Sequence, residues 1–272
     1  YIDNGSITSV QGFTASGIHC GLKKKNKDLA LIHSQVPCTS AGTFTTNKAA
    51  AAPVIISKKV IESDSEVKTI IINSANANAC TGIEGHLDAI EIQSKCADVL
   101  EISPSEILVS STGVIGERLN VSAITNSLQQ LKENLSEDGG ISAAEAIMTT
   151  DTVSKHFAVK VELSKGNIFI GGIAKGSGMI MPNMATMLGF VTTDAKISKS
   201  LLHEALTDAV NDSYNKISVD GETSTNDMVI ALSTGLSNVE IKNDSSEFYN
   251  FTSALKELCI KMAKAIVFDG EG

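Results

Sequence analysis

The chain has 272 residues, a formal net charge of −9 at pH 7, and only 4% aromatic residues with no tryptophan. This length can bury a sizeable core, as one large domain or about two smaller ones, so a mini-protein is excluded. A hydrophobic content of 42% against 19% charged residues excludes a disordered chain. The acidic balance disfavours nucleic acid and anionic membranes as partners, and there are too few aromatic rings to stack bases. A small-molecule partner is expected.

The sequence shows neither a membrane span nor a signal peptide. No run approaches the roughly 18 or more apolar residues of a membrane span, and the first residues lack the basic start and apolar stretch of a signal peptide. We therefore expect a cytoplasmic protein, or one whose export segment has been removed. The five cysteines are scattered without a C-x-x-C pair, which predicts reduced and mostly buried thiols.

Apolar runs rich in β-branched residues alternate with stretches of helical period. This alternation predicts an α/β (α+β) fold in which mixed sheets are layered with helices. The strands expected in chain order cover residues 29–32, 67–72, 106–110, 156–163, 167–174, 184–192 and 228–233. The expected helices cover residues 85–100, 121–135, 142–148, 198–215 and 246–267. Apolar residues at helical spacing form one face of the fourth helix, from Leu202 to Val210, with Ser198 as its N-cap, and of the fifth, from Phe251 to Ile266. Alternating apolar residues on both sides of the turn at 164–166 predict a hairpin there.

Several common catalytic patterns are missing. The histidines stand far apart, with no H-E-x-x-H pair and no Cys/His cluster, so no metal site is expected. There is no G-x-S-x-G elbow, and the glycines of 171–178 lack the spacing of a phosphate-binding loop. We expect neither a metal nor a cofactor.

Three segments stand out as candidates for chemistry. Lys175 is the single charge in a run of glycines and methionines, so it either snorkels to the surface or awaits an anion. The stretch 107–116 reads as a strand followed by a glycine-bearing bend, which is either a plain turn or an oxyanion hole built from backbone N–H groups. The third segment, 220–227, is rich in hydroxyl and acidic side chains, which by itself indicates a loop.

Together these segments resemble the ornithine acetyltransferase family, the arginine-pathway enzymes that move an acetyl group from N2-acetylornithine to L-glutamate. The matching stretches follow one another over essentially the whole chain. They are residues 41–47, 73–82, 111–116, 146–152, 175–186, 219–227 and 267–272. The resemblance implies an ornithine acetyltransferase-like fold, related in mechanism to N-terminal-nucleophile enzymes.

The resemblance also implies self-cleavage between Ala185 and Thr186. Cleavage frees Thr186 as an N-terminal nucleophile. A threonine hydroxyl is weak unless a base takes its proton, and an α-amine with a pKa of about 7.7–8.0 can serve as that base. One cut would therefore create the base and release the nucleophile together.

Family analogy assigns the remaining site residues. Thr112 and Gly113 would stabilise the oxyanion, while Thr149, Lys175 and Glu271, together with the nucleophile, would contact substrate. Our hypothesis is that Lys175 binds a carboxylate common to ornithine and glutamate, and that Glu271 faces an ammonium group. The resulting mechanism is ping-pong acyl transfer, in which the nucleophile is acetylated by the donor and deacetylated by glutamate.

The resemblance divides the chain into an α-chain segment, 1–185, and the start of a β-chain segment, 186–272, and it implies an assembly of two α and two β chains. The family chain normally continues past Gly272. Acetyl-CoA stays open as a second acetyl donor, and no nucleic acid or membrane partner is expected. Two other hypotheses stay open: an N-terminal-nucleophile amidohydrolase or aminopeptidase, in which water accepts the acyl group, and an inactive small-molecule-binding homologue.

Overall fold

The structure is a computed structural model, and it describes all residues of the chain except 64, 179–186, 222–223 and 271–272. The strands are β1 (Phe13–Ile18), β2 (Leu29–Phe44), β3 (Val67–Asn73), β4 (Ile107–Ser111), β5 (Lys155–Leu163), β6 (Gly166–Lys175), β7 (Leu188–Thr193), β8 (Lys196–Ile197), β9 (Met228–Ser233) and β10 (Glu240–Ile241). The helices are α1 (Ala52–Glu62), α2 (Gly82–Leu100), α3 (Val121–Thr125), α4 (Leu128–Glu133), α5 (Gly140–Ala146), α6 (Lys199–Asn211) and α7 (Ser246–Phe268). The expected α/β fold with mixed sheets is confirmed.

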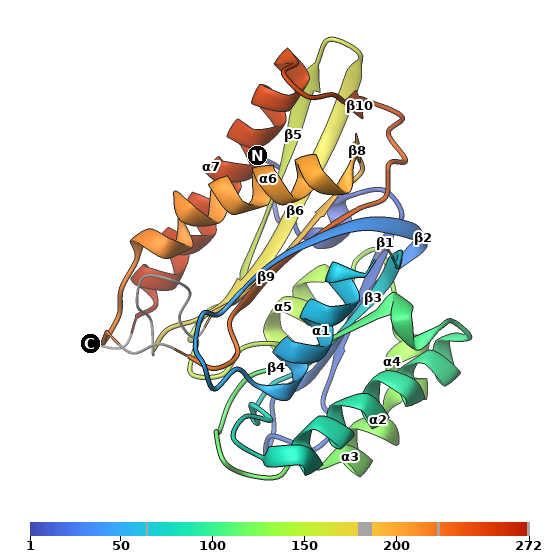
Figure 1. Cartoon of the computed structure of the whole chain (residues 1–272), viewed down its shortest axis with the longest axis vertical. Coiled ribbons are helices and arrows are strands. Elements are labelled where there is room, and N and C mark those ends of the chain that lie inside the picture. The colour runs from blue at the N-terminus through green and yellow to red at the C-terminus, as the bar shows by residue number, and fades with distance from the viewer. Residues whose placement is uncertain (64, 179–186, 222–223, 271–272) are drawn as a thin grey trace.

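One long strand, β2, joins the two halves of the main sheet (Figure 1). The strand order is β4-β3-β2-β9-β7-β6-β5, with β1 paired to β2. The register of β2 shifts between His33 and Cys38, so its first part pairs with β1 and β3 and its last part with β9. We call β1, β3, β4 and the start of β2 the first half-sheet. The end of β2 with β9, β7, β6 and β5 is the second half-sheet.

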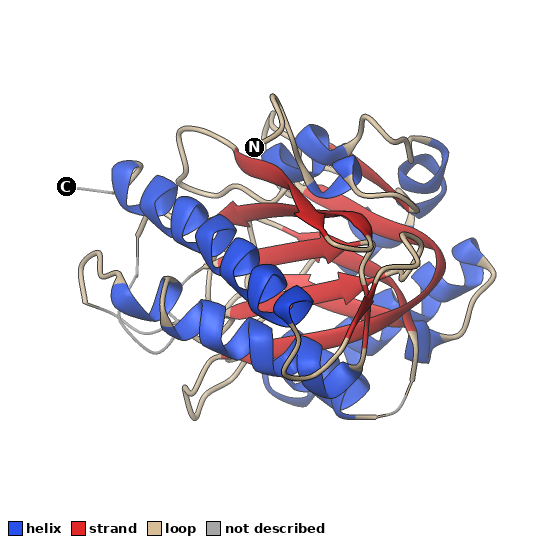
Figure 2. Cartoon of the chain, turned by 90° about the horizontal axis from the view of Figure 1, so that it is seen from above, coloured by secondary structure: helices blue, strands red, loops and turns tan. Residues whose placement is uncertain are grey.

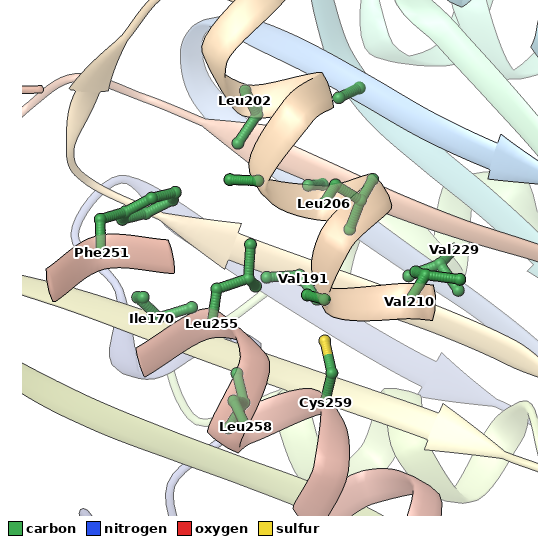
Figure 3. Packing of buried hydrophobic residues seen from close by; sticks show 14 of the residues in the cluster. Ile170, Val191, Leu202, Leu206, Val210, Val229, Phe251, Leu255, Leu258 and Cys259 are labelled. Atoms are coloured by element: carbon green, nitrogen blue, oxygen red, sulfur yellow. The ribbon is translucent and has the colours of Figure 1, made fainter. Parts of the chain in front are cut away.

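Three hydrophobic clusters fill the spaces between the layers of helices and strands. In the first, α6 and α7 pack on β5, β6, β7 and β9, as Figures 2 and 3 show. The second lies between the two half-sheets and includes side chains of β1, β3, β6, β7 and β9 together with residues of α1 and α5. The third fills the space between the first half-sheet and α2, α3 and α4. The fold is therefore a stack in which helices cover two facing half-sheets, and an apolar core fills each layer boundary.

The predicted helix faces explain this packing. The α6 residues predicted to form one apolar stripe, from Leu202 to Val210, are the ones buried, and the Ser198 hydroxyl accepts the N–H of Leu201 as predicted for an N-cap. The stripe of α7 from Phe251 to Ile266 is likewise buried. Both predictions are confirmed.

Some element predictions were wrong or incomplete. The helix predicted over 121–135 is divided into α3 and α4, where the Ser127 hydroxyl donates to the Ala123 carbonyl and competes with the helical pattern. The strand predicted to end at Ile32 continues to Phe44 through the register shift. Strand β1 and helix α1 were missed.

The two predicted chain segments, 1–185 and 186–272, share one sheet. Strands β7 and β9 of the later segment lie between β2 and β6 of the earlier one. A cut between the segments would therefore leave both parts hydrogen-bonded in the same sheet. The division itself stays a prediction.

The five cysteines are free thiols, and Cys38, Cys96 and Cys259 are buried, as predicted. Burial raises the pKa of each of these three thiols to about 12, so they stay protonated at neutral pH. Within the described part of the chain, every helix is too short or too polar to cross a membrane.

Candidate active site

A row of paired residues at one end of the second half-sheet locates the site. Lys175, the last residue of β6, pairs with Leu188 of β7, which pairs with Met228 of β9, and Met228 pairs with Phe44 of β2. The register thus brings Lys175 beside the residue where β7 begins. Ala185 and Thr186, the predicted cleavage site and nucleophile, precede Leu188 in the chain and lie outside the described residues.

Lys175 points into the protein and not into solvent. Its side chain is 2% exposed, and its Nζ donates to Thr112 Oγ1 at 3.2 Å. Burial lowers the pKa of the ammonium, and the nearby carboxyl groups of Asp151 and Asp227 oppose that shift. The sequence left two interpretations of Lys175 open, and the one in which its ammonium group reaches the surface is therefore wrong. The buried cation next to Thr112 agrees with the other reading, a lysine that awaits an anion.

The bend after β4 places Thr112 and Gly113 against the neighbouring loop. The Thr112 N–H donates to the Asn73 carbonyl at 3.0 Å, so the side-chain hydroxyl is the group that Thr112 can direct elsewhere. Gly113 has φ +134°, and a Cβ there would lie 2.2 Å from the carbonyl carbon of Ala75. Only glycine fits this bend without moving the backbone. Because the Thr112 N–H is already bonded, the bend does not offer two consecutive free N–H groups.

The loop before β9 connects this bend to the start of β7. The Asn226 side-chain amide donates to the carbonyls of Ala77, at 2.6 Å, and Ser111, at 2.9 Å. The next residue, Asp227, accepts the N–H of Met187 through Oδ1 at 3.0 Å. Sequence reasoning assigned this segment to a loop and missed both roles. The loop holds Ser111, which precedes the bend, and Met187, which follows Thr186 in the chain.

Asp227 makes stability depend on pH. Burial raises the pKa of its carboxyl to about 8, although Met187, Ser224 and Lys175 lower it. This folded-state pKa is above the unfolded value, so between about pH 4 and pH 8 the Asp227 carboxyl is protonated in the folded chain and ionised in the unfolded chain. The proton therefore stabilises the folded protein at low pH, and this contribution is lost as pH rises through that window. Asp227→Asn keeps an oxygen acceptor for Met187 but cannot ionise. Between pH 5 and 8 we expect the unfolding free energy to fall less steeply in Asp227→Asn than in the wild type. The two slopes should differ by up to about 1.4 kcal/mol per pH unit. Denaturant unfolding at several pH values tests this, and identical slopes would contradict it.

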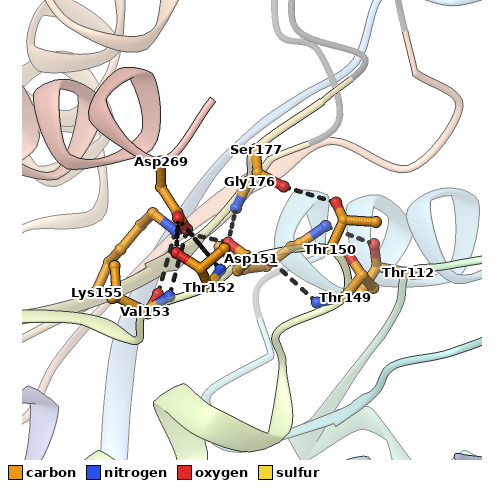
Figure 4. Close-up of polar contacts among 11 residues, drawn as sticks. Thr112, Thr149, Thr150, Asp151, Thr152, Val153, Lys155, Gly176, Ser177 and Asp269 are labelled. Atoms are coloured by element: carbon orange, nitrogen blue, oxygen red, sulfur yellow. Dashed lines mark hydrogen bonds and ion pairs between the residues drawn. The ribbon is translucent and has the colours of Figure 1, made fainter. Parts of the chain in front are cut away.

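Thr149 is joined to the Lys175 segment through Asp151 (Figure 4). The buried carboxylate of Asp151 accepts the N–H of Thr149 at 3.0 Å and that of Gly176 at 2.7 Å. Burial raises the pKa of Asp151, but the charges of Lys175 and Lys155 and the hydrogen bonds outweigh it and hold the pKa below its usual value. A pocket of about 380 Å³ opens beside Thr149 and Asp151 and is otherwise lined by Lys23, Lys25, Asn26, Lys27, Glu145 and Met148.

The described part of the site therefore brings together four of the predicted residues. Lys175 and Thr112 are in contact, Gly113 follows Thr112, and Thr149 is held to the same segment through Asp151. Glu271 lies outside the described residues, as do Ala185 and Thr186. Asp151, Asn226 and Asp227 were missed, although the resemblance placed each of them inside a matching stretch.

The fold and the site together define a class of protein. Two half-sheets joined by β2 are covered by helices, and a buried lysine, Lys175, lies near the bend that contains Gly113. The L-aminopeptidase D-Ala-esterase/amidase of Ochrobactrum anthropi, described as a variant of the Ntn-hydrolase fold, has this fold with a TM-score of 0.62 at 13% identity, covering 98% of this chain and 86% of that one. A model of the ArgJ family matches residues 14–272. The chain belongs to the ArgJ family, and the resemblance seen in the sequence is confirmed.

Individual curated relatives also support membership of the ArgJ family. Over 272 residues the chain is 46% identical to the arginine biosynthesis bifunctional protein ArgJ of Oceanobacillus iheyensis, covering all of this chain and 66% of that protein. It is 47% identical to the chloroplastic ArgJ of Oryza sativa subsp. japonica, covering 98% of this chain and 59% of that protein. The chain thus spans about two thirds, or less, of these curated relatives' length.

Two solved structures each match about two thirds of this chain. ArgJ of Bacillus halodurans matches with a TM-score of 0.65 at 44% identity, covering 68% of this chain and 96% of that one. The ornithine acetyltransferase of Mycobacterium tuberculosis, solved in complex with ornithine, matches with a TM-score of 0.61 at 33% identity, covering 66% of this chain and 96% of that one.

Proposed function

We propose that this protein is a glutamate N-acetyltransferase that moves the acetyl group of N2-acetylornithine to L-glutamate in arginine biosynthesis. The observation that carries the proposal is the contact between the buried ammonium of Lys175 and the hydroxyl of Thr112, beside a bend that only glycine fits. Membership of the ArgJ family and the ornithine complex of a relative support the same chemistry.

The chemistry starts with cleavage before Thr186. The new α-amine takes the proton of the Thr186 hydroxyl, which attacks the acetyl carbonyl of N2-acetylornithine and releases ornithine. The glutamate amine then takes the acetyl group from the ester. Each half-reaction passes through a tetrahedral oxyanion, and enzymes stabilise such anions with preorganised donors.

Lys175 and Thr112 form one donor unit in this proposal. Because the Thr112 hydroxyl accepts the ammonium hydrogen, its own hydrogen is free to point at an oxyanion, and a charged neighbour strengthens that donation. The Gly113 N–H supplies the second donor. Lys175 also offers positive charge for a substrate carboxylate, with Thr149 and Glu271 as further contacts.

The finer features belong to the same proposal. The protein acts in the cytoplasm as two α chains, 1–185, and two β chains that begin at Thr186. Acetyl-CoA is an additional donor to be tested, because the curated relatives are named as bifunctional. Because β7 and β9 lie between β2 and β6, the two parts of a cleaved protein would stay together in one sheet.

Product analysis tests the proposed function. Protein mixed with N2-acetylornithine and glutamate should form N-acetylglutamate and ornithine in equal amounts. Free acetate as the only acyl product would favour the amidohydrolase, and no turnover of either kind would favour an inactive binding protein. A parallel reaction with acetyl-CoA in place of N2-acetylornithine decides between one donor and two.

Thr112→Val removes the hydroxyl but keeps the shape of the side chain. Since the Thr112 N–H bonds to Asn73 through the backbone, the variant keeps that contact and loses only the hydroxyl, both as a donor and as the acceptor for Lys175 Nζ. We expect kcat to fall by about a hundredfold to a thousandfold, with little change in KM. Thr125→Val on α3 serves as the control and should be unaffected. Steady-state kinetics check this, and a kcat for Thr112→Val within about threefold of wild type would refute the donor role.

A further inference from the structure

Three buried charged side chains form a cluster beside the site (Figure 4). Lys155 Nζ lies 2.7 Å from Asp151 Oδ1 and 2.6 Å from Asp269 Oδ2. The side chains of Lys155, Asp151 and Asp269 are 1%, 0% and 4% exposed. Replacing a buried ion pair by apolar residues of similar volume often costs no stability. A contribution to stability is therefore a poor explanation for the presence of this cluster. The segments that its three residues hold in place suggest a different role.

Asp151 holds two segments of the site at once. Its two oxygens accept the N–H groups of Thr149 and Gly176, and Gly176 directly follows Lys175. Both substrate contacts on the α-chain segment, Thr149 and Lys175, are therefore fixed through one carboxylate.

Asp269 brings a third segment into the cluster. It caps the C-terminal end of α7, accepts the N–H of Thr152 at 3.0 Å and also bonds to the Thr152 hydroxyl. Asp269 precedes Glu271 by two positions in the chain. Through Lys155, the end of α7 is tied to the turn that carries Thr149 and Asp151.

We propose that Asp151, Lys155 and Asp269 are positioning residues that hold the substrate contacts Thr149 and Lys175 in one arrangement. The inference rests on the proposed function for the identity of those contacts. Lys155 is the centre of the unit, because its single ammonium group forms ion pairs with both carboxylates and joins α7 to the turn before β5. Misplacing a binding group by about 1 Å can cost a hundredfold in rate, so loosening this unit should weaken substrate binding without removing any contact.

Two variants separate positioning from simple stabilisation. Lys155→Met removes the central charge, and Asp269→Asn keeps the shape of the side chain while removing its charge. Lys160→Met is the matched control, because Lys160 lies on the same strand and its ion pair with Glu162 is exposed. Each variant is assayed for its unfolding temperature, for kcat and KM, and for ornithine affinity by calorimetry, at a temperature where all are folded.

The expected result is an ornithine Kd and a KM about tenfold higher in Lys155→Met and Asp269→Asn, with a smaller change in kcat and none in Lys160→Met. Unchanged Kd and KM in both variants, with only a lower unfolding temperature, would overturn the inference. If Lys155→Met fails to fold, the Asp269→Asn result alone decides. Wild type that binds ornithine but transfers no acetyl group would overturn the proposed function, and the affinity comparison would still test the positioning role.

Discussion

Thr186→Ala should leave the chain uncleaved and reduce acetyl transfer by at least about a thousandfold, because the proposed reaction passes through an ester on that hydroxyl. In the proposed reaction the same side chain acts twice, first as the attacking group in self-cleavage and then as the nucleophile in transfer. A denaturing gel should show one band for the variant and two for the wild type, and an initial-rate assay measures transfer.

Thr186→Ser is the matched comparison for this experiment. Serine keeps the hydroxyl and, after cleavage, the adjacent α-amine, so we expect it to retain cleavage and part of the activity. A cleaved and active Thr186→Ala protein would show that another residue is the nucleophile.

Lys175→Met should lower kcat/KM by about a hundredfold or more with both N2-acetylornithine and glutamate. The variant removes a buried cation that donates to Thr112 and that we propose binds a carboxylate common to both substrates. Under this hypothesis one carboxylate subsite serves both half-reactions, so the KM values for donor and acceptor should rise together.

Lys216→Met provides the control for Lys175→Met. Lys216 forms an exposed ion pair with Asp212 after α6, so its loss removes the same charge from the protein without touching the site. Normal KM values for both substrates in Lys175→Met would contradict the carboxylate hypothesis. A rise for only one substrate would assign the lysine to that substrate alone.

Local patterns in the sequence predicted the fold well and singled out Lys175 and the bend at Gly113 as candidates. Lys175 is conspicuous because it is a lone charge among glycines and methionines, and the bend at Gly113 follows a clear strand. Both features depend on residues close together in the chain. The helices α6 and α7 were predicted for the same reason, because their apolar stripes repeat at helical spacing.

The residues that assemble the site could not be predicted in this way. Asn226 bonds to Ala77 and Ser111, which lie 149 and 115 residues away, and Lys155 bonds to Asp269, 114 residues away. An amide in a loop and a lysine at the start of a strand carry no sign of such partners in a single sequence. Helix α1 is a different case, since Pro53 in its first turn is a helix-start signal that was available.

Strand β2 shows how tertiary context overrides a local pattern. The predicted strand ended at Ile32, yet β2 continues and changes partner from β3 to β9. This continuation joins the two half-sheets. The contact between Thr112 on one side and Lys175 on the other depends on that junction.

The central claim is acetyl transfer through a cleaved chain that begins with Thr186, and trapping the intermediate tests it most directly. Protein mixed with N2-acetylornithine in the absence of glutamate is quenched, and its fragments are weighed by mass spectrometry. We predict a fragment that starts at Thr186 and carries one acetyl group, which is lost when glutamate is added and N-acetylglutamate appears. N-acetylglutamate formed by an intact chain, or by a cleaved chain whose Thr186 fragment never carries acetyl, would contradict the account.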